Sequence, residues 1–373
     1  MPIIPVHHAL GTYDVHVTPG ALRSLPELLA QALGPRKLVL ISDDVVDRYY
    51  DEWTRACAAD ASGTGPGIRL RTEARLSFPA GEASKTRETW IRLSDEMLAL
   101  GLDRQAAVVA LGGGVVGDLA GFVAATFLRG VPYAQVPTTL LAMLDASVGG
   151  KVGVDTPLGK NLIGAFHPPA IVVADPLALL SLPDRVYRAG LAEAVKHGVI
   201  ADAAYFTWIE GNAPRLIARE LDVLTHLVTR SVEIKAAVVS EDEREGGRRA
   251  ILNAGHTIAH GLEQESHYQL PHGEAVALGL LGECRIAERM GLAPAGLGER
   301  VLGALRALGL PTRAAKRPEI ARVLEAMLHD KKNRDGQVQL ALPIGLGAMH
   351  EGGGTWTVPV TQDLLASAVG GLA

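Results

Sequence analysis

The chain has 373 residues, of which 48% are hydrophobic and 21% charged, and its formal net charge is −5 at pH 7. This length allows two domains with substantial cores, and the composition is typical of a soluble enzyme. The acidic balance argues against a nucleic-acid-binding protein.

The two cysteines, Cys57 and Cys284, lie far apart and form no C-x-x-C pair, so the sequence predicts neither a disulfide framework nor a cysteine zinc site. The first residues lack a basic segment followed by an apolar run. The longest apolar stretch, residues 106–130, is interrupted by Asp118 and several glycines, so it is a poor candidate for a membrane span. These features predict a cytoplasmic protein.

The first half of the chain alternates buried-strand patterns with helical ones. The predicted strands are residues 37–42, 106–114, 133–139 and 170–176, and the predicted helices are residues 84–101 and 115–130. Strands that alternate with helices predict a mainly parallel, Rossmann-like α/β sheet.

Helical patterns dominate the second half, at residues 181–200, 223–243 and 274–291, with one late strand predicted at 337–343. The composition changes near residue 178. The sequence therefore predicts a nucleotide-binding α/β domain, residues 1–178, followed by a mostly helical domain for metal and substrate, residues 179–373.

A glycine loop, LGGGVVGD (111–118), follows a predicted strand and precedes a predicted helix. Glycines at this point allow a pyrophosphate to approach the backbone, and the helix N-terminus attracts negative charge. The next strand does not end in the acidic residue that the dinucleotide pattern expects, but Asp43 and Asp44 end an earlier strand. The loop therefore predicts a phosphate site in a sheet with unusual strand order; the alternative is a tight turn without ligand.

Residues 144–166 carry Asp145, Lys151, Asp155, Lys160 and Asn161 among glycines, with almost no helical or strand period. Lysine is rare in this chain, at nine residues against 27 arginines, so two lysines in one short segment are informative. The segment predicts a long functional loop that binds an anionic substrate such as a phosphate monoester. The alternative is a solvated loop with scattered charges.

Residues 253–279 contain four histidines, His256, His260, His267 and His272. His256 and His260 lie one helical turn apart if the segment is helical. The cluster suggests a metal site, but it lacks the H-E-x-x-H pattern, so the spacing leaves the choice of ligands open.

Seven segments together resemble, in order, the motifs of 3-dehydroquinate synthases, within the sugar phosphate cyclase group. They are GGGVVGDLAGF, RGVPYAQVPTTLLAMLDASVGGK, GKNLIGAFHPP, GLAEAVKHG, LNAGHTIAHGLE, LPHGEAVALG and DKK. The resemblance runs from about residue 40 to residue 335.

The resemblance implies a phosphorus–oxygen lyase of the shikimate pathway that uses NAD⁺ and a divalent metal, zinc or cobalt. Its substrate would be 3-deoxy-D-arabino-heptulosonate 7-phosphate, and its products 3-dehydroquinate and phosphate. Transient oxidation by NAD⁺ would permit elimination of phosphate, and the hydride would then be returned. The alternatives are another cyclase, acting on sedoheptulose 7-phosphate, glucose 6-phosphate or an amino sugar, and a metal-dependent polyol dehydrogenase.

The resemblance also implies a homodimer and a set of site residues. The implied metal ligands are Glu193, His256 and His272. The implied substrate and catalytic residues are Arg129, Asp145, Lys151, Lys160, Asn161, Lys196, Lys235, Arg249, Asn253, His260 and one of Lys331 or Lys332. The implied nucleotide contacts are Asp43 or Asp44, Glu82, Lys85, Gly113, Gly114, Asp118, Thr138, Thr139, Lys151, Lys160 and Ser181. Two positions, Asp155 and Val186, depart from the residues that many members carry there.

Overall fold

A computed structural model describes residues 2–49, 71–157, 159–328 and 337–373. The chain divides into two compact units, Met1–Leu182 and Pro183–Ala373. Lys331 and Lys332, one of which the family resemblance implies at the substrate, lie outside the described residues.

The first unit is built on a seven-stranded sheet with the order β1-β2-β9-β6-β5-β3-β4. Only the β1–β2 pair is antiparallel, and the other pairs are parallel. The strands are β1 Ile3–His8, β2 Gly11–Val17, β3 Lys37–Asp43, β4 Arg71–Phe78, β5 Ala106–Gly112, β6 Tyr133–Pro137 and β9 Ile171–Ala174. The predicted mainly parallel α/β sheet is confirmed.

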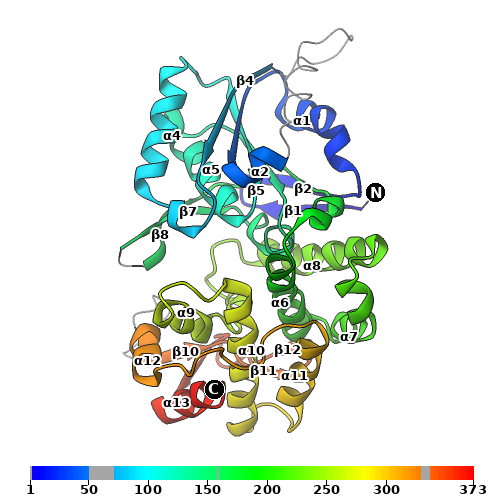
Figure 1. The fold of residues 1–373 in the computed structure, drawn as a ribbon, viewed down its shortest axis with the longest axis vertical. Helices are drawn as coiled ribbons and strands as arrows, with labels where there is room; N and C mark the ends of the chain where they lie inside the picture. Colours follow the sequence, from blue (N-terminus) through cyan, green and yellow to red (C-terminus); the bar gives the residue numbers. More distant parts are fainter. Residues whose placement is uncertain (1, 50–70, 158, 329–336) are drawn as a thin grey trace. The chain divides into compact units, whose positions relative to one another are not determined.

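Helices cover both faces of this sheet (Figure 1). The helices are α1 Leu25–Leu33, α2 Asp44–Tyr49, α4 Arg87–Ala99 and α5 Gly114–Thr126, with the short turns η1 Ala21–Ser24, η2 Glu82–Ser84, η3 Phe127–Arg129, η4 Ala142–Ala146 and η5 Pro176–Ser181. Val108 of β5 packs in one core with residues of α4 and α5, whereas its neighbour Val109 packs in a second core with residues of α1. Because successive side chains of a strand point to opposite faces, the central strands are buried on both sides.

Residues 144–166 do not form the irregular loop that the sequence predicts. After η4 they form an antiparallel hairpin of β7, Lys151–Thr156, and β8, Gly159–Phe166. The glycines that indicated a loop instead allow the two strands to approach, since a Cβ on Gly153 would lie 2.6 Å from the carbonyl oxygen of Ile163. Four consecutive residues of β8 are exposed, so the hairpin lacks the alternating apolar pattern of a half-buried strand.

The second unit is mostly helical. Its helices are α6 Asp184–Ala201, α7 Ala203–Ile217, α8 Leu221–Glu241, α9 His256–Glu265, α10 His272–Arg289, α11 Leu297–Ala307, α12 Ile320–Leu328 and α13 Gln362–Gly370, and η6 spans Arg248–Asn253. Two small antiparallel ribbons pair β10 Val338–Leu340 with β13 Val358–Val360, and β11 Pro343–Gly345 with β12 Ala348–Met349. Among the described residues, no helix is long and apolar enough to cross a membrane.

Candidate active site

Several of the predicted nucleotide residues follow the carboxyl ends of β3, β5 and β6. Ser42 is paired with Leu111, and Gly112 with Pro137, so Asp43, the glycine loop and Thr138 follow adjacent strands at one edge of the sheet. In the sheet, β4 lies on one side of β3 and β5 lies on the other. The strand order therefore reverses between β3 and β5. Open α/β sheets bind ligands in the crevice at such points.

Close packing accounts for part of the glycine pattern. A Cβ on Gly117 would lie 2.5 Å from Oε1 of Gln135 on β6, so this glycine lets α5 pack tightly against the sheet. Cβ atoms on Gly113 and Gly114 would make tight contacts of 3.1 Å and 3.3 Å, with Thr139 and Ala146 respectively. Gly113 caps α5 and presents the N-terminus of this helix at the sheet edge, where a phosphate is favoured.

Asp43 and Asp44 both accept hydrogen bonds from the backbone. Asp43 Oδ1 accepts from the N–H groups of Val45 and Val46, and Asp44 Oδ1 accepts from the N–H of Ala80. Burial raises the pKa of Asp43 above its usual value, although those backbone hydrogen bonds lower it. The second oxygen of Asp44 pairs with exposed Arg48 at 3.2 Å, so a ribose at Asp44 would have to share that oxygen with the guanidinium.

A polar cluster in the first unit joins η2, α5 and the β7–β8 hairpin. The buried Lys85 ammonium donates to Asp118 Oδ2 at 2.6 Å and to Asn161 Oδ1 at 2.5 Å. Burial disfavours the charged amine, but the carboxylates of Asp118, Glu82 and Asp155 outweigh it and raise the pKa of Lys85. Lys85 therefore stays protonated beside a residue of the hairpin, surrounded by carboxylates.

Asp155 fixes the backbone of the same hairpin. Its Oδ1 accepts from the N–H of Asn161, which has a left-handed φ of +55°. Burial raises the pKa of Asp155 to about 6, against the opposing effect of Lys85. Lys160, the neighbour of Asn161, pairs with Glu82 at 3.4 Å.

Four other predicted residues of the first unit lie on neighbouring elements. Lys151 begins β7, Asp145 lies on η4 next to Ala146, and Ser181 ends η5 with its hydroxyl donating to the carbonyl of Ala178. Arg129 is exposed and lies beyond the far end of α5, a helix about 20 Å long at 1.5 Å per residue.

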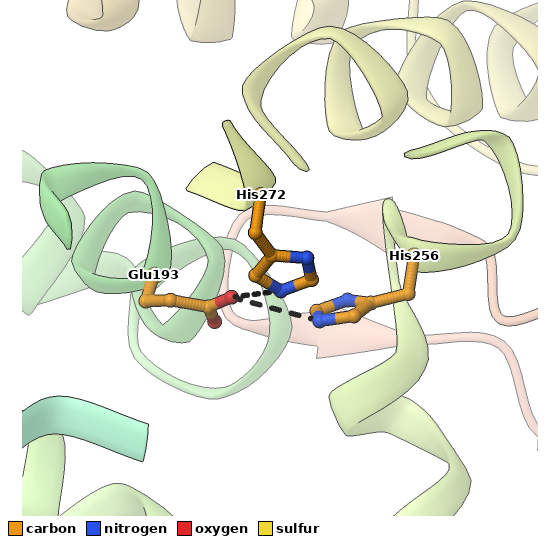
Figure 2. A group of neighbouring side chains, drawn as sticks. All are labelled: Glu193, His256 and His272. Carbon is orange, nitrogen blue, oxygen red and sulfur yellow. Dashed lines mark ion pairs between the residues drawn. The ribbon is translucent and has the colours of Figure 1, made fainter. Parts of the chain in front are cut away.

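In the second unit, Glu193, His256 and His272 converge from α6, α9 and α10 (Figure 2). Glu193 Oε1 lies 3.6 Å from Nε2 of His256 and 3.8 Å from Nε2 of His272. Glu193 has no exposed surface, and none of the described residues donates a hydrogen bond to its Oε1. Its other oxygen, Oε2, pairs with the buried ammonium of Lys196.

The other nitrogen of each histidine faces an acceptor, which decides the tautomer. Nδ1 of His256 lies 3.2 Å from the carbonyl oxygen of Ala254, and Nδ1 of His272 lies 3.4 Å from Glu263 Oε2. A carbonyl only accepts, so Nδ1 of His256 carries the proton and its Nε2 presents a lone pair toward Glu193. The carboxylate oxygen and the lone pairs of the two Nε2 atoms repel one another, and a cation between them would remove this repulsion.

The separations also fit a metal ion. Zinc binds histidine nitrogen and carboxylate oxygen at about 2.0–2.2 Å, so tetrahedral ligand atoms lie about 3.4 Å apart. The separations of 3.6 and 3.8 Å are close to this value and too long for hydrogen bonds. One carboxylate and two histidines therefore fit a zinc-type site with an open position for substrate.

Close helix packing fixes where the histidines lie. Gly255, with φ +81°, directly precedes His256, and a Cβ there would lie 2.9 Å from the backbone nitrogen of Leu280 on α10. Gly273 directly follows His272, and a Cβ there would overlap the carbonyl of Ala189 on α6. These glycines allow α6, α9 and α10 to meet closely enough for their side chains to share one ion.

Two further predicted residues of this unit lie on elements that contact α6. Lys235 on α8 and Arg249 on η6 are buried, and both α8 and η6 contact α6. Asp242 holds the turn before Arg249, because its carboxylate accepts from the N–H groups of Gly246, Gly247 and Arg249. Those hydrogen bonds outweigh burial and lower the pKa of Asp242.

Asn253 and His260 complete the predicted set. The Asn253 amide donates to Glu245 Oε1 at 2.7 Å, and the His260 ring lies 5.7 Å from the ring of His256 and 6.2 Å from that of His272. Sequence reasoning missed Glu263, which is buried and contacts His272. Its position three residues after His260 on one helix was the available signal.

Known proteins resemble this chain over most of its length. A family model described as 3-dehydroquinate synthase N-terminal matches residues 75–189, and one described as 3-dehydroquinate synthase C-terminal matches residues 190–333. A 3-dehydroquinate synthase of Caulobacter vibrioides is 45% identical over 351 residues, which covers 92% of this chain and 93% of that protein. The chain belongs to the 3-dehydroquinate synthase family.

Solved structures of sugar phosphate cyclases share the fold. A 2-deoxy-scyllo-inosose synthase, complexed with carbaglucose-6-phosphate, NAD⁺ and Co²⁺, superposes with a TM-score of 0.88 at 26% identity over 100% of both chains. A 2-epi-5-epi-valiolone synthase from Streptomyces hygroscopicus, with NAD⁺ and Zn²⁺ bound, gives a TM-score of 0.85 at 31% identity over 96% of both chains. The predicted family and the predicted enzyme class are confirmed.

Proposed function

We propose that this protein converts 3-deoxy-D-arabino-heptulosonate 7-phosphate to 3-dehydroquinate and phosphate, with NAD⁺ and a divalent metal. The observation that carries the proposal is the convergence of Glu193, His256 and His272 in a chain of this family. The relatives that are 42–45% identical are 3-dehydroquinate synthases, whereas the two cyclases with other products are 26% and 31% identical. This difference favours the heptulosonate phosphate over the other cyclase substrates.

In this proposal Glu193, His256 and His272 hold zinc or cobalt. When bound, the ion supplies a Lewis acid that lowers the pKa of substrate hydroxyl groups. Lys196 neutralises Glu193, and Arg249 is suited to the substrate carboxylate because its planar guanidinium can pair with both oxygens. His260, Lys235 and Asn253 line the substrate beside them.

The first unit would bind NAD⁺ at the carboxyl ends of β3, β5 and β6. When bound, NAD⁺ supplies a reversible hydride acceptor. The N-terminus of α5 orients the pyrophosphate through Gly113 and Gly114, and Asp43 or Asp44 holds a ribose. Thr138, Thr139, Ser181 and the Lys85–Asp118 pair complete the nucleotide contacts, with Glu82 beside them.

The lysines and the amide of the β7–β8 segment, Lys151, Lys160 and Asn161, bind the phosphate of the substrate, and Asp145 lies on the preceding turn. Arg129 is exposed at the opposite end of α5 from the glycine loop. We place it in the active site of a partner copy, which requires a homodimer. The proposed location is the cytoplasm.

The decisive experiment compares substrates. Purified protein with NAD⁺ and Zn²⁺ is supplied with the heptulosonate phosphate or with sedoheptulose 7-phosphate, and inorganic phosphate and NADH absorbance are followed. We expect phosphate release from the first substrate only, no net NADH, and loss of activity when a chelator removes the metal while far-ultraviolet circular dichroism is unchanged. Turnover of sedoheptulose 7-phosphate alone would assign another cyclase, and net NADH a dehydrogenase.

A further inference from the structure

A buried carboxylate that the proposed function does not use lies behind one of the metal ligands. Glu263 is on α9 and only 2% exposed. A carboxylate in such surroundings is costly unless it is paired or hydrogen-bonded. Its Oε2 lies 3.4 Å from Nδ1 of His272, which begins a different helix, α10.

Nδ1 of the two histidines at the proposed metal site, His256 and His272, faces different kinds of acceptor. His256 directs Nδ1 to a neutral carbonyl oxygen, that of Ala254, whereas His272 directs Nδ1 to a carboxylate. A carboxylate that accepts the Nδ1 proton fixes the ring orientation and the tautomer, and it makes Nε2 a better electron donor. The affected nitrogen is the one at the proposed metal site, because Nε2 of His272 faces Glu193.

We propose that Glu263 is a positioning residue that holds His272 with its Nε2 lone pair directed at the metal and thereby strengthens metal binding. This inference rests on the proposed metal site at Glu193, His256 and His272. Ordered partners of this kind change metal affinity by about 10–100-fold when they are removed.

A competing role for Glu263 also follows from the geometry. His260, Glu263 and His272 each have a ligand atom within 4.8 Å of the other two, so Glu263 could itself bind a second ion. The two roles differ in stoichiometry. A positioning role requires one ion per chain, and a ligand role requires two.

The test uses Glu263→Gln in the full chain, which keeps the size of the side chain but removes its charge. Metal-free protein is titrated with Zn²⁺ against a competing chromophoric chelator, and the Co²⁺ form is followed by its visible absorption. The matched control is Glu288→Gln on the same helix as His272. Glu288 is half-buried and accepts the N–H of Gly298 at 2.9 Å, and no hydrogen bond or ion pair with a histidine is described for it.

We expect one Zn²⁺ per chain in the parent protein, a 10–100-fold weaker affinity and an altered Co²⁺ spectrum in Glu263→Gln, and parent behaviour in Glu288→Gln. The unfolding midpoint is also measured without metal. If the midpoint of Glu263→Gln equals that of the parent protein, its weaker metal binding is due to lost positioning and not to a damaged fold. Parent-like affinity in a folded Glu263→Gln would overturn the inference and leave the metal site intact. Two Zn²⁺ per parent chain, falling to one in the variant, would replace the positioning role with a ligand role.

A second measurement needs no folded variant at position 263. Imidazole ¹⁵N NMR of the Zn²⁺-bound parent protein, with the His272 signals assigned by their loss in His272→Ala, reports the tautomer directly. We expect the proton on Nδ1, and a proton on Nε2 would overturn the inference. Absence of Zn²⁺ binding by the parent protein would instead refute the metal part of the proposed function.

Discussion

Replacing Gly279 with alanine tests whether close helix packing sets the geometry of the metal site. Gly279 lies inside α10, opposite Gly255, which directly precedes His256 on α9. A Cβ at residue 279 would overlap the carbonyl oxygen of Gly255 and would lie 2.9 Å from its carbonyl carbon and 3.0 Å from the backbone nitrogen of Ala259. All three are backbone atoms, so they cannot rotate away.

The size of the effect follows from these distances. Carbon atoms pack at about 3.5–4.0 Å, so α9 and α10 must separate by roughly 1 Å. Such overpacking costs about 1–3 kcal/mol, and alanine regains at most about 1 kcal/mol of helix propensity. We expect Gly279→Ala to lose about 1–2 kcal/mol of unfolding free energy. A displacement of about 1 Å at a catalytic site lowers the rate by about 100-fold, so phosphate release should fall by that order.

Gly303→Ala is the matched control. Gly303 also lies inside a helix, α11, but apart from the adjoining backbone of that helix no atom of the described residues lies within 4 Å of the position where its Cβ would be. This variant should gain about 0.5–1 kcal/mol and keep its activity. The two variants and the parent protein are compared by urea unfolding of the metal-free form, by Zn²⁺ affinity and by initial rate. If Gly279→Ala behaved like Gly303→Ala in all three assays, close packing at Gly279 would not position His256.

Three further outcomes are expected. His272→Ala should bind Zn²⁺ more than about 100-fold less tightly and lose activity, and retained activity would remove His272 from the ligand set. Burial raises the pKa of Asp155 from 3.8 to about 6, so the protonated form stabilises the fold below about pH 4 and this contribution is lost as the pH rises through 6. The unfolding free energy of the parent protein relative to Asp155→Asn should therefore fall by about 1–2 kcal/mol between pH 4 and 7, allowing for solvent screening, and a difference independent of pH would contradict the assigned shift. Cys284 is fully buried and its pKa is raised by burial, so in a Cys57→Ser background thiol reagents should label the protein only on unfolding; fast labelling of the native protein would show that Cys284 is accessible.

The sequence predicts the centre of the sheet well because burial there leaves a clear pattern. Every residue of β5, Ala106–Gly112, is buried, and such strands appear as continuous apolar runs. The β7–β8 hairpin leaves no such pattern, because glycines make its close backbone contacts and much of β8 is exposed. The β1 strand contains Pro5 and lies at the sheet edge, where proline is tolerated but strand signals are weak.

Local sequence patterns alone could not identify all the ligands of the proposed metal site. His256 and His272 lie in an obvious cluster, but Glu193 is 63 residues before His256, and only the family resemblance singled it out. A glutamate on a helix is by default an exposed residue, whereas Glu193 is completely buried. Its burial depends on the contact of α6 with α10, which includes the close approach of Gly273 to Ala189. Such a contact between distant segments has no local signature in the sequence.

The pairing of Glu193 with Lys196 explains why this site would suit an anionic substrate. Both side chains are about 1% exposed, so each offsets the cost of burying the other. With neutral histidines, the protein ligands and Lys196 carry no net charge, and a divalent ion held there would keep nearly its full charge for substrate oxygens. Lys235 and Arg249 add two more buried cations on elements that contact α6. The same pairing makes Glu193 a poor position for testing the metal, because its replacement would also leave Lys196 buried without this carboxylate, at a cost of about 3–5 kcal/mol. His256 is better suited to that test, because its Nδ1 faces the neutral carbonyl oxygen of Ala254, whereas Nδ1 of His272 faces the buried carboxylate of Glu263.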